Sequence, residues 1–181
     1  MGLRNRKQFI DSSCFFVTTS CKDHLHLLKP DLCKKIVAES INFLQAKYNT
    51  HALGYVIMPN HIHLILFFEK ENKLSDFMRD MKKYTSVQIR KELERSGEAL
   101  LPKLNYRHRA QVFKVWDDGF DDVWIGSQHV LETKLGYIHS NPLQEHWNLA
   151  VHPEEYRFSS SCFYERDIQP DIKVTHYKEF F

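Results

Sequence analysis

The stretch ALGYVIM-PN-HIHLILFF, residues 52–68, decides the fold. Its two apolar halves, 52–58 and 61–68, are short and rich in β-branched and aromatic side chains, which is typical of strands. Pro59 and Asn60 between them favour a turn. The sequence therefore predicts a β-hairpin at this point.

Elements on both sides of the hairpin alternate between strand and helix. Residues 15–20 (FFVTTS) predict a strand, and residues 31–48 carry apolar side chains at spacings of three and four, which predicts a helix. A second helix is expected to begin near residues 75–76 and to end before Gly97. The order is therefore strand, helix, strand, strand, helix.

The second half of the chain is less regular. Residues 111–116 predict a further strand and residues 122–125 a short one. Ser127 is expected to cap a helix that runs to about Ser140, where Asn141 and Pro142 end it. From residue 147 onward we expect an irregular wrap over the surface.

The composition indicates one globular domain. The chain has 181 residues, of which 43% are hydrophobic and 27% charged, and this excludes disordered and low-complexity classes. We assign residues 1–165 to a single domain and residues 166–181 to a C-terminal tail. No apolar run suggests a membrane span or a signal peptide, so a cytoplasmic protein is expected. Four cysteines without C-x-x-C spacing predict free thiols.

Two histidines stand out within the hairpin. His61 and His63 are two residues apart, so in a strand both side chains point to the same face and can converge on one metal ion. The alternative is that both are packed core residues. His24 and His26 have the same spacing without a strand pattern around them, and we expect that pair to be structural or solvated.

A second group of candidate residues lies on the helix that follows Ser127. Lys134, Tyr137 and Asn141 share a strip at the flank of its apolar stripe. A phenol is a weak nucleophile unless a nearby cation or metal favours the phenolate, and Lys134 is one turn away. Asn141 offers an amide oxygen that suits a hard divalent ion. Alternatively, Tyr137 is a packing residue whose hydroxyl faces water.

The formal net charge is only +2, so any affinity for nucleic acid must come from local clusters of charge. Four basic residues fall on one face of the second helix, and others lie in the N-terminal arm and near residue 108. A solvated helix face is the alternative to a surface that follows a phosphate backbone. The residues assigned to this surface are Arg4, Arg6, Lys7, Arg79, Lys82, Lys83, Arg90, Arg107 and Arg109.

Four segments resemble those of a known family. MPNHIHLIL (58–66) and YIHSNPLQEHW (137–147) resemble the two signature blocks of the single-tyrosine HUH transposases. MKKYTSVQIRK (81–91) and PEEYRFSSSCFY (153–164) are similar to elements of the REP-associated tyrosine transposase branch. The resemblance covers most of residues 8–165. It implies a ferredoxin-like α+β fold of HUH endonuclease type, with the histidines on a central antiparallel sheet.

The resemblance also implies a site and a reaction. His61 and His63 fall on the family's metal-binding pair and Tyr137 on its nucleophile. The third ligand, a glutamine in the insertion-sequence members, is Asn141 here, as in the REP-associated branch. The implied cofactor is Mg²⁺ or Mn²⁺. The implied substrates are single-stranded DNA hairpins, cleaved and rejoined through a 5′-phosphotyrosine by a monomer or homodimer.

Two other functions fit the same residues. The first is a non-catalytic nucleic-acid-binding module, because a ferredoxin-like sheet with aromatic side chains is also an RNA-binding architecture. The second is a metal-dependent phosphoesterase in which the ion activates water and Tyr137 is structural. The first predicts binding that ignores metal, and the second predicts turnover without a covalent adduct.

Overall fold

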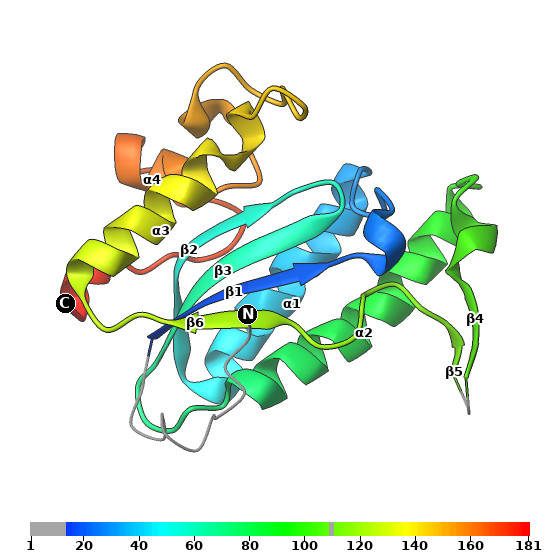
Figure 1. Ribbon diagram of the computed structural model, residues 1–181, viewed down its shortest axis with the longest axis horizontal. Helices are drawn as coiled ribbons and strands as arrows, with labels where there is room; N and C mark the ends of the chain where they lie inside the picture. The colour runs from blue at the N-terminus through cyan, green and yellow to red at the C-terminus, as the bar shows by residue number, and fades with distance from the viewer. Residues whose placement is uncertain (1–13, 109–110) are drawn as a thin grey trace.

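The computed structural model describes residues 14–108 and 111–181. Within them, four strands form one antiparallel sheet in the order β2-β3-β1-β6 (Figure 1). The strands are β1 (Cys14–Ser20), β2 (Thr50–Ile57), β3 (His61–Phe68) and β6 (Asp121–Trp124). Helices α1 (Asp31–Tyr48) and α2 (Leu74–Arg95) cover one face, and α3 (Gln128–Ser140) lies on the other.

The order along the chain is β1-α1-β2-β3-α2-β6, the connectivity of the ferredoxin-like motif. β1 and β2 run in the same direction because each pairs antiparallel with β3, which lies between them. The predicted α+β class and the predicted hairpin are therefore confirmed. The short strand expected at 122–125 is β6, at the edge of the sheet beside β1.

The two faces of β3 differ in chemistry. Ile62, Leu64, Leu66 and Phe68 point toward α1 and α2, where the Phe68 ring meets that of Phe77 with centroids 6.3 Å apart. The opposite face carries the two histidines at the start of the strand. On β1, Thr18 lies opposite His63. The sheet thus buries one face completely and presents polar side chains at one end of the other.

Helix α3 approaches the sheet closely at Gly54 of β2. A Cβ atom there would lie 2.5 Å from Leu135 Cδ1, so glycine permits this contact. Ser127 caps the helix as predicted, with the Val130 N–H donating to its side-chain oxygen at 3.4 Å. This contact brings α3 close to β2, and the last turn of the helix faces the start of β3.

The strand expected at 111–116 is only partly correct. β5 (Gln111–Phe113) is shorter, and it pairs with β4 (Asn105–His108), a strand that the sequence pattern did not predict. The two form a separate small sheet beyond the end of α2 (Figure 1). Trp116, after β5, is buried and donates through Nε1 to Thr85 Oγ1 of α2 at 2.9 Å.

The C-terminal part of the chain covers the outer edge of β2. The Ile57 N–H donates to the Phe158 carbonyl at 2.9 Å, and Val174 forms a parallel bridge with Ala52. The irregular wrap expected here contains a short helix, α4 (Ser161–Arg166). Ile172 is fully buried, so residues 166–181 contribute side chains to the core.

All four cysteines are free thiols, as predicted. Burial raises the pKa of the Cys14 and Cys33 thiols to about 12. Among the described residues, no helix combines the length and the apolar character that crossing a bilayer requires.

Candidate active site

The two histidines of β3 line a small cavity at the end of the sheet. Their ring centroids are 4.8 Å apart, with the planes inclined at 73°. The last turn of α3 and the loop after it form the other wall. The cavity has a volume of about 300 Å³ and is lined by Ser20, His24, Asn60, His61, His63, Tyr137, Asn141, Gln144, His146 and Trp147.

Each histidine is held through its Nδ1 atom. His63 Nδ1 lies 2.8 Å from Thr18 Oγ1, and His61 Nδ1 lies 2.6 Å from Asn60 Oδ1. The Asn60 amide nitrogen donates to the His24 carbonyl at 3.3 Å, which assigns its oxygen to His61. Because that oxygen only accepts, the neutral His61 ring carries its proton on Nδ1. Such a partner on one ring nitrogen is typical of metal-binding histidines, whose other nitrogen faces the ion.

Burial keeps both imidazoles neutral. It lowers the pKa of His61 to about 4 and that of His63 to about 3. The neighbouring imidazole of His61 and the ammonium of Lys134 contribute to the lowered pKa of His63, after burial. Since a metal ion binds the neutral ring, the site is ready to accept one at neutral pH.

The side chain of Asn141 favours the presence of a metal ion in this cavity. Its side chain is buried, and its Oδ1 atom has no hydrogen-bond partner among the described residues. Its Nδ2 atom lies 3.4 Å from His63 Nε2, and a rotation of the amide would exchange the two atoms. An unsatisfied buried amide oxygen destabilises a protein. A divalent cation beside the imidazoles would satisfy it.

The donor set is two imidazoles and one amide. No group of three or more His, Cys, Asp or Glu side chains suited to a metal occurs in the described ranges 14–108 and 111–181. Imidazole and amide oxygen together fit a divalent ion of intermediate to hard character. The residues present therefore fit the expected ion.

Tyr137 projects from α3 at the mouth of the cavity. Its side chain is 45% exposed, and its hydroxyl forms no hydrogen bond with the described residues. Its ring lies edge-on to those of His63, at 5.3 Å, and Phe16, at 6.1 Å. Lys134 Nζ lies over the face of the same Phe16 ring at 4.8 Å. The structure therefore brings together all five residues expected at the site: His61, His63, Lys134, Tyr137 and Asn141.

The basic residues expected to bind DNA lie elsewhere. Arg4, Arg6, Lys7 and Arg109 fall outside the described residues, as does the side chain of Arg107, whose backbone lies in β4. The other four lie on α2. These are Arg79, Lys82, Lys83 and Arg90.

Three of the four α2 residues have acidic or carbonyl partners. Arg79 pairs with Asp76 at 2.5 Å, and Arg90 pairs with Glu94 at 2.8 Å. The Lys82 ammonium donates to the backbone carbonyls of residues 117, at 2.5 Å, and 119. Lys83 is exposed and has no ion pair within the described part of the chain. Among these four assigned residues, Lys83 is thus the cation most available to an external anion.

Several residues of the site were not anticipated from the sequence. Thr18 and Asn60 orient the histidines, and His24 lines the cavity although its pair with His26 was expected to be structural or solvated. Thr18 could have been found from the alternation of side chains along β1, because Thr18 lies on the same face of that strand as Phe16. Trp147 and Gln144 follow the tyrosine helix in a loop whose path no local pattern reveals.

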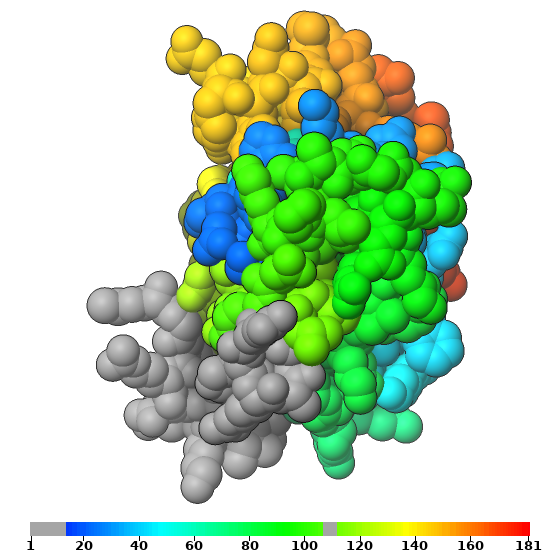
Figure 2. Space-filling view, turned by 90° about the vertical axis from the view of Figure 1, so that its right-hand side faces the viewer, coloured from blue at the N-terminus to red at the C-terminus, as the bar shows by residue number. Residues whose placement is uncertain are grey.

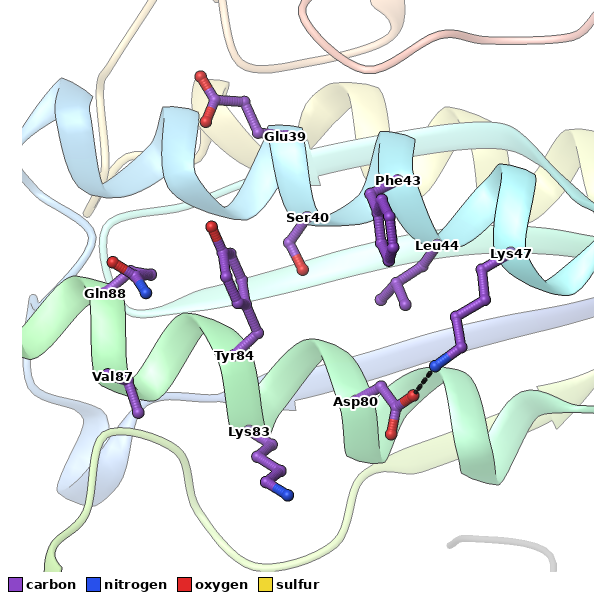
Figure 3. Close-up of a pocket in the computed structure, with 10 residues that line it drawn as sticks. All are labelled: Glu39, Ser40, Phe43, Leu44, Lys47, Asp80, Lys83, Tyr84, Val87 and Gln88. Atoms are coloured by element: carbon purple, nitrogen blue, oxygen red, sulfur yellow. Dashed lines mark hydrogen bonds and ion pairs between the residues drawn. The ribbon is translucent and has the colours of Figure 1, made fainter.

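A larger hollow lies on the other side of the molecule, between α1 and α2 (Figure 3). It has a volume of about 730 Å³ and shares no lining residue with the histidine cavity. Lys47 of α1 and Asp80 of α2 form an ion pair at 2.5 Å at its edge (Figure 3). Its lining lacks histidine, so the smaller cavity is the candidate for metal-dependent chemistry.

The chain belongs to the IS200-like transposase family, whose model matches residues 13–141. A solved REP-associated tyrosine transposase bound to a REP hairpin has the same fold, with a TM-score of 0.63 and 16% identity over 91% of this chain and 86% of that one. A putative transposase from Deinococcus radiodurans R1 gives a TM-score of 0.48 and 14% identity over 71% of this chain and 90% of that one. No functionally curated protein matches.

These comparisons confirm the predicted transposase family. They also confirm that the fold is that of a REP-associated tyrosine transposase. Residues 58–66 and the first five residues of the block 137–147 lie within the matched range.

Proposed function

We propose that this transposase is a metal-dependent single-stranded DNA endonuclease and strand transferase that acts through a 5′-phosphotyrosine. The observation that carries the proposal is the convergence of Tyr137 and Asn141, whose buried Oδ1 has no partner among the described residues, on one histidine, His63. A nucleophile and a set of metal ligands in one cavity suit attack on a phosphodiester.

The residues divide the work between them. His61, His63 and Asn141 would hold Mg²⁺ or Mn²⁺, which when bound polarises the scissile phosphate. The rings of His63 and Phe16 restrict the Tyr137 side chain, so that its hydroxyl is presented at the cavity mouth. Lys134, held over Phe16, places a positive charge on the same side of the sheet.

The reaction exchanges one phosphoester bond for another. The Tyr137 oxygen bonds to phosphorus, the bond from phosphorus to the 3′ oxygen breaks, and that oxygen leaves as a 3′-hydroxyl. The tyrosine proton is released to solvent, and the departing 3′ oxygen takes up one proton from solvent in its place. Since the number of phosphoester bonds is unchanged, attack by a second 3′-hydroxyl reverses the step and joins a new strand.

We propose DNA hairpins formed by REP-like palindromes as the substrate. The likeness to a transposase solved with a REP hairpin supports this choice. Phosphate contacts are expected from Lys83 and from the remaining basic residues of the proposed surface, so affinity should fall steeply with salt.

The test uses hairpins from the chain's own genomic flanks, labelled at either end, with Mn²⁺ or EDTA on a denaturing gel. We expect a metal-dependent protein adduct that carries only the 3′ label and is absent in Tyr137→Phe and His63→Ala. Tyr84→Phe is the matched control, because Tyr84 is a similarly exposed tyrosine on α2.

Each other outcome points to a rival function. An adduct that persists in Tyr137→Phe contradicts the assignment of the nucleophile. Cleavage without any adduct indicates a phosphoesterase that uses activated water. Metal-independent binding without cleavage indicates a nucleic-acid-binding module.

A further inference from the structure

Trp147 forms part of the wall of the histidine cavity, and the proposed reaction does not use it. Its ring centroid lies 5.9 Å from that of His61 and 5.5 Å from that of His26. The backbone N–H of Trp147 donates to the Gln144 carbonyl at 2.8 Å, so the residue lies in a tight turn at the end of the loop's first segment. The same cavity is lined by Tyr137 and Asn141. An indole therefore lies beside the expected position of the scissile phosphate.

The indole is only partly covered by protein. Trp147 is half-buried, and the described rings around it, those of His26, His61 and His146, are inclined to it by 42° to 48°. None of them stacks flat upon it. A partly exposed indole that lines a cavity offers a platform for another planar ring.

Polar side chains surround this platform. Gln144, His24 and His146 line the same cavity and supply hydrogen-bond donors and acceptors. Asp23 and His24 have φ angles of 51° and 52°, a backbone conformation that non-glycine residues rarely adopt, in the turn that carries His24. Figure 2 shows the segment after β1 (blue) directly below the loop that follows α3 (yellow). A flat apolar surface with polar groups around it matches the chemistry of a nucleobase.

We propose that Trp147 is the platform of a nucleobase-binding subsite, on which the unpaired base next to the scissile phosphate stacks. The subsite rests on the proposed function and adds to it the contact that places one nucleotide beside His61. Stacking on an aromatic ring accepts any base, so this subsite selects unpaired DNA rather than a particular sequence. A base held in a duplex cannot use it.

Photocrosslinking tests the contact without knowledge of the target sequence. Short oligothymidylates that carry one 5-iododeoxyuridine are irradiated with the protein, and the attached peptide is identified by mass spectrometry. We expect the crosslink at Trp147. Trp124, which is 44% exposed on β6 and does not line the cavity, is the internal control. Crosslinks at Trp124 and none at Trp147 would overturn the proposal.

A binding cycle separates stacking from structural damage. Trp147→Leu should weaken binding of the oligothymidylate by about 5-fold to 100-fold, while Trp147→Phe retains most of the affinity. An oligomer of abasic deoxyribose phosphates should bind the wild type and Trp147→Leu equally, because the backbone charges are unchanged. Equal losses for both ligands would show that Trp147 only packs.

The outcome is separable from that of the proposed reaction. A crosslink at Trp147 in a protein that forms no Tyr137 adduct supports the subsite and contradicts the reaction. An adduct formed without any contribution from Trp147 contradicts the subsite alone.

Discussion

The ring of Tyr137 lies edge-on to the imidazole of His63, with centroids 5.3 Å apart and planes inclined at 69°. The two residues belong to α3 and β3, and Phe16 of β1 contacts both, stacking on His63 at 5.4 Å. One side chain of a third element thus sets the spacing between the expected nucleophile and an expected metal ligand. Changes that shift α3 against the sheet should therefore affect metal binding and DNA cleavage together.

Removal of the Thr18 hydroxyl should weaken metal binding. In Thr18→Val, His63 loses the partner of its Nδ1 atom, and we expect Mn²⁺ affinity to fall by about 10-fold to 100-fold. Thr18→Ser keeps the hydroxyl and should retain most of the affinity. Isothermal titration with Mn²⁺ measures both.

Thr19→Val is the matched control for this change. Thr19 is the next residue on β1, and its buried hydroxyl has no partner among the described residues. Its replacement should leave Mn²⁺ affinity unchanged and the free energy of unfolding equal or higher. A loss of affinity as large as that of Thr18→Val would contradict the role of Thr18.

Asn141 should contribute more to metal binding than to stability. In Asn141→Leu we expect Mn²⁺ affinity to fall at least about tenfold, because the amide oxygen is gone. The free energy of unfolding in EDTA should change by less than about 1 kcal/mol, since the substitution removes only the long contact of Nδ2 with His63 and an oxygen that has no partner among the described residues. Asn141→Asp, which keeps a side-chain oxygen at this position, should bind Mn²⁺ more tightly than Asn141→Leu does. Wild-type affinity in Asn141→Leu, measured by electron paramagnetic resonance, would exclude Asn141 as a ligand.

A methyl group at Gly54 should displace the Leu135 side chain of α3. Because the added Cβ would meet Leu135 Cδ1 at 2.5 Å, Gly54→Ala should lower the free energy of unfolding by about 1–3 kcal/mol and weaken Mn²⁺ binding. Shortening the partner with Leu135→Ala should lessen the effect of Gly54→Ala on metal binding. Urea denaturation and Mn²⁺ titration report the two effects.

The control for Gly54 is a glycine on α3 itself. A Cβ added at Gly136 meets nothing within 4 Å, so Gly136→Ala should raise the free energy of unfolding by about 0.5–1 kcal/mol through helix propensity. If Gly54→Ala were equally stabilising, the contact between position 54 and the Leu135 side chain would not be a tight one.

The ion pair between α1 and α2 should stabilise the protein in a pH-dependent way. Asp80 accepts hydrogen bonds from Lys47 at 2.5 Å and from the Tyr48 hydroxyl at 2.7 Å, and these hold the pKa of its carboxyl far below the usual range. Asp80→Asn should lower the free energy of unfolding by about 1 kcal/mol at pH 7.

The sign of the pH effect follows from the depressed pKa. The unfolded carboxyl takes up a proton near pH 4, whereas the folded one resists it, so the stabilisation is present above about pH 4 and is lost below it. The difference between the wild type and Asp80→Asn should shrink accordingly. Asp76→Asn, which removes only the more exposed contact with Arg79, should change stability by less than about 0.5 kcal/mol.

Local patterns predict the main elements because each has a regular period. The apolar spacing of α1 is continuous from Asp31 to Tyr48, and Asn49, in a left-handed conformation, ends the helix at the predicted residue. Strand β3 is predicted exactly for the same reason. β4 and β5 are too short to carry a period, so their pairing with each other depends on contacts that the sequence does not display.

The predicted site residues depend on two local patterns, the alternation along β3 and the helical spacing of α3. Their convergence requires the packing of α3 on Gly54, and the sequence gives no measure of that distance. The pairing of Arg79 with Asp76 is visible as a three-residue spacing, whereas Lys82 finds its carbonyl partners in a distant turn. The charge pattern alone therefore overestimates the number of basic side chains on α2 that are free to contact DNA.

The placement of the histidines and Tyr137 on distant elements has a consequence during synthesis. The ribosome releases β3 well before α3, since α2, the small sheet and β6 lie between them. A nascent or prematurely terminated chain therefore contains His61 and His63 without Tyr137. On the proposed mechanism, a fragment that ends before α3 is expected to leave the genome of its cell uncut, because cleavage would need the completed domain.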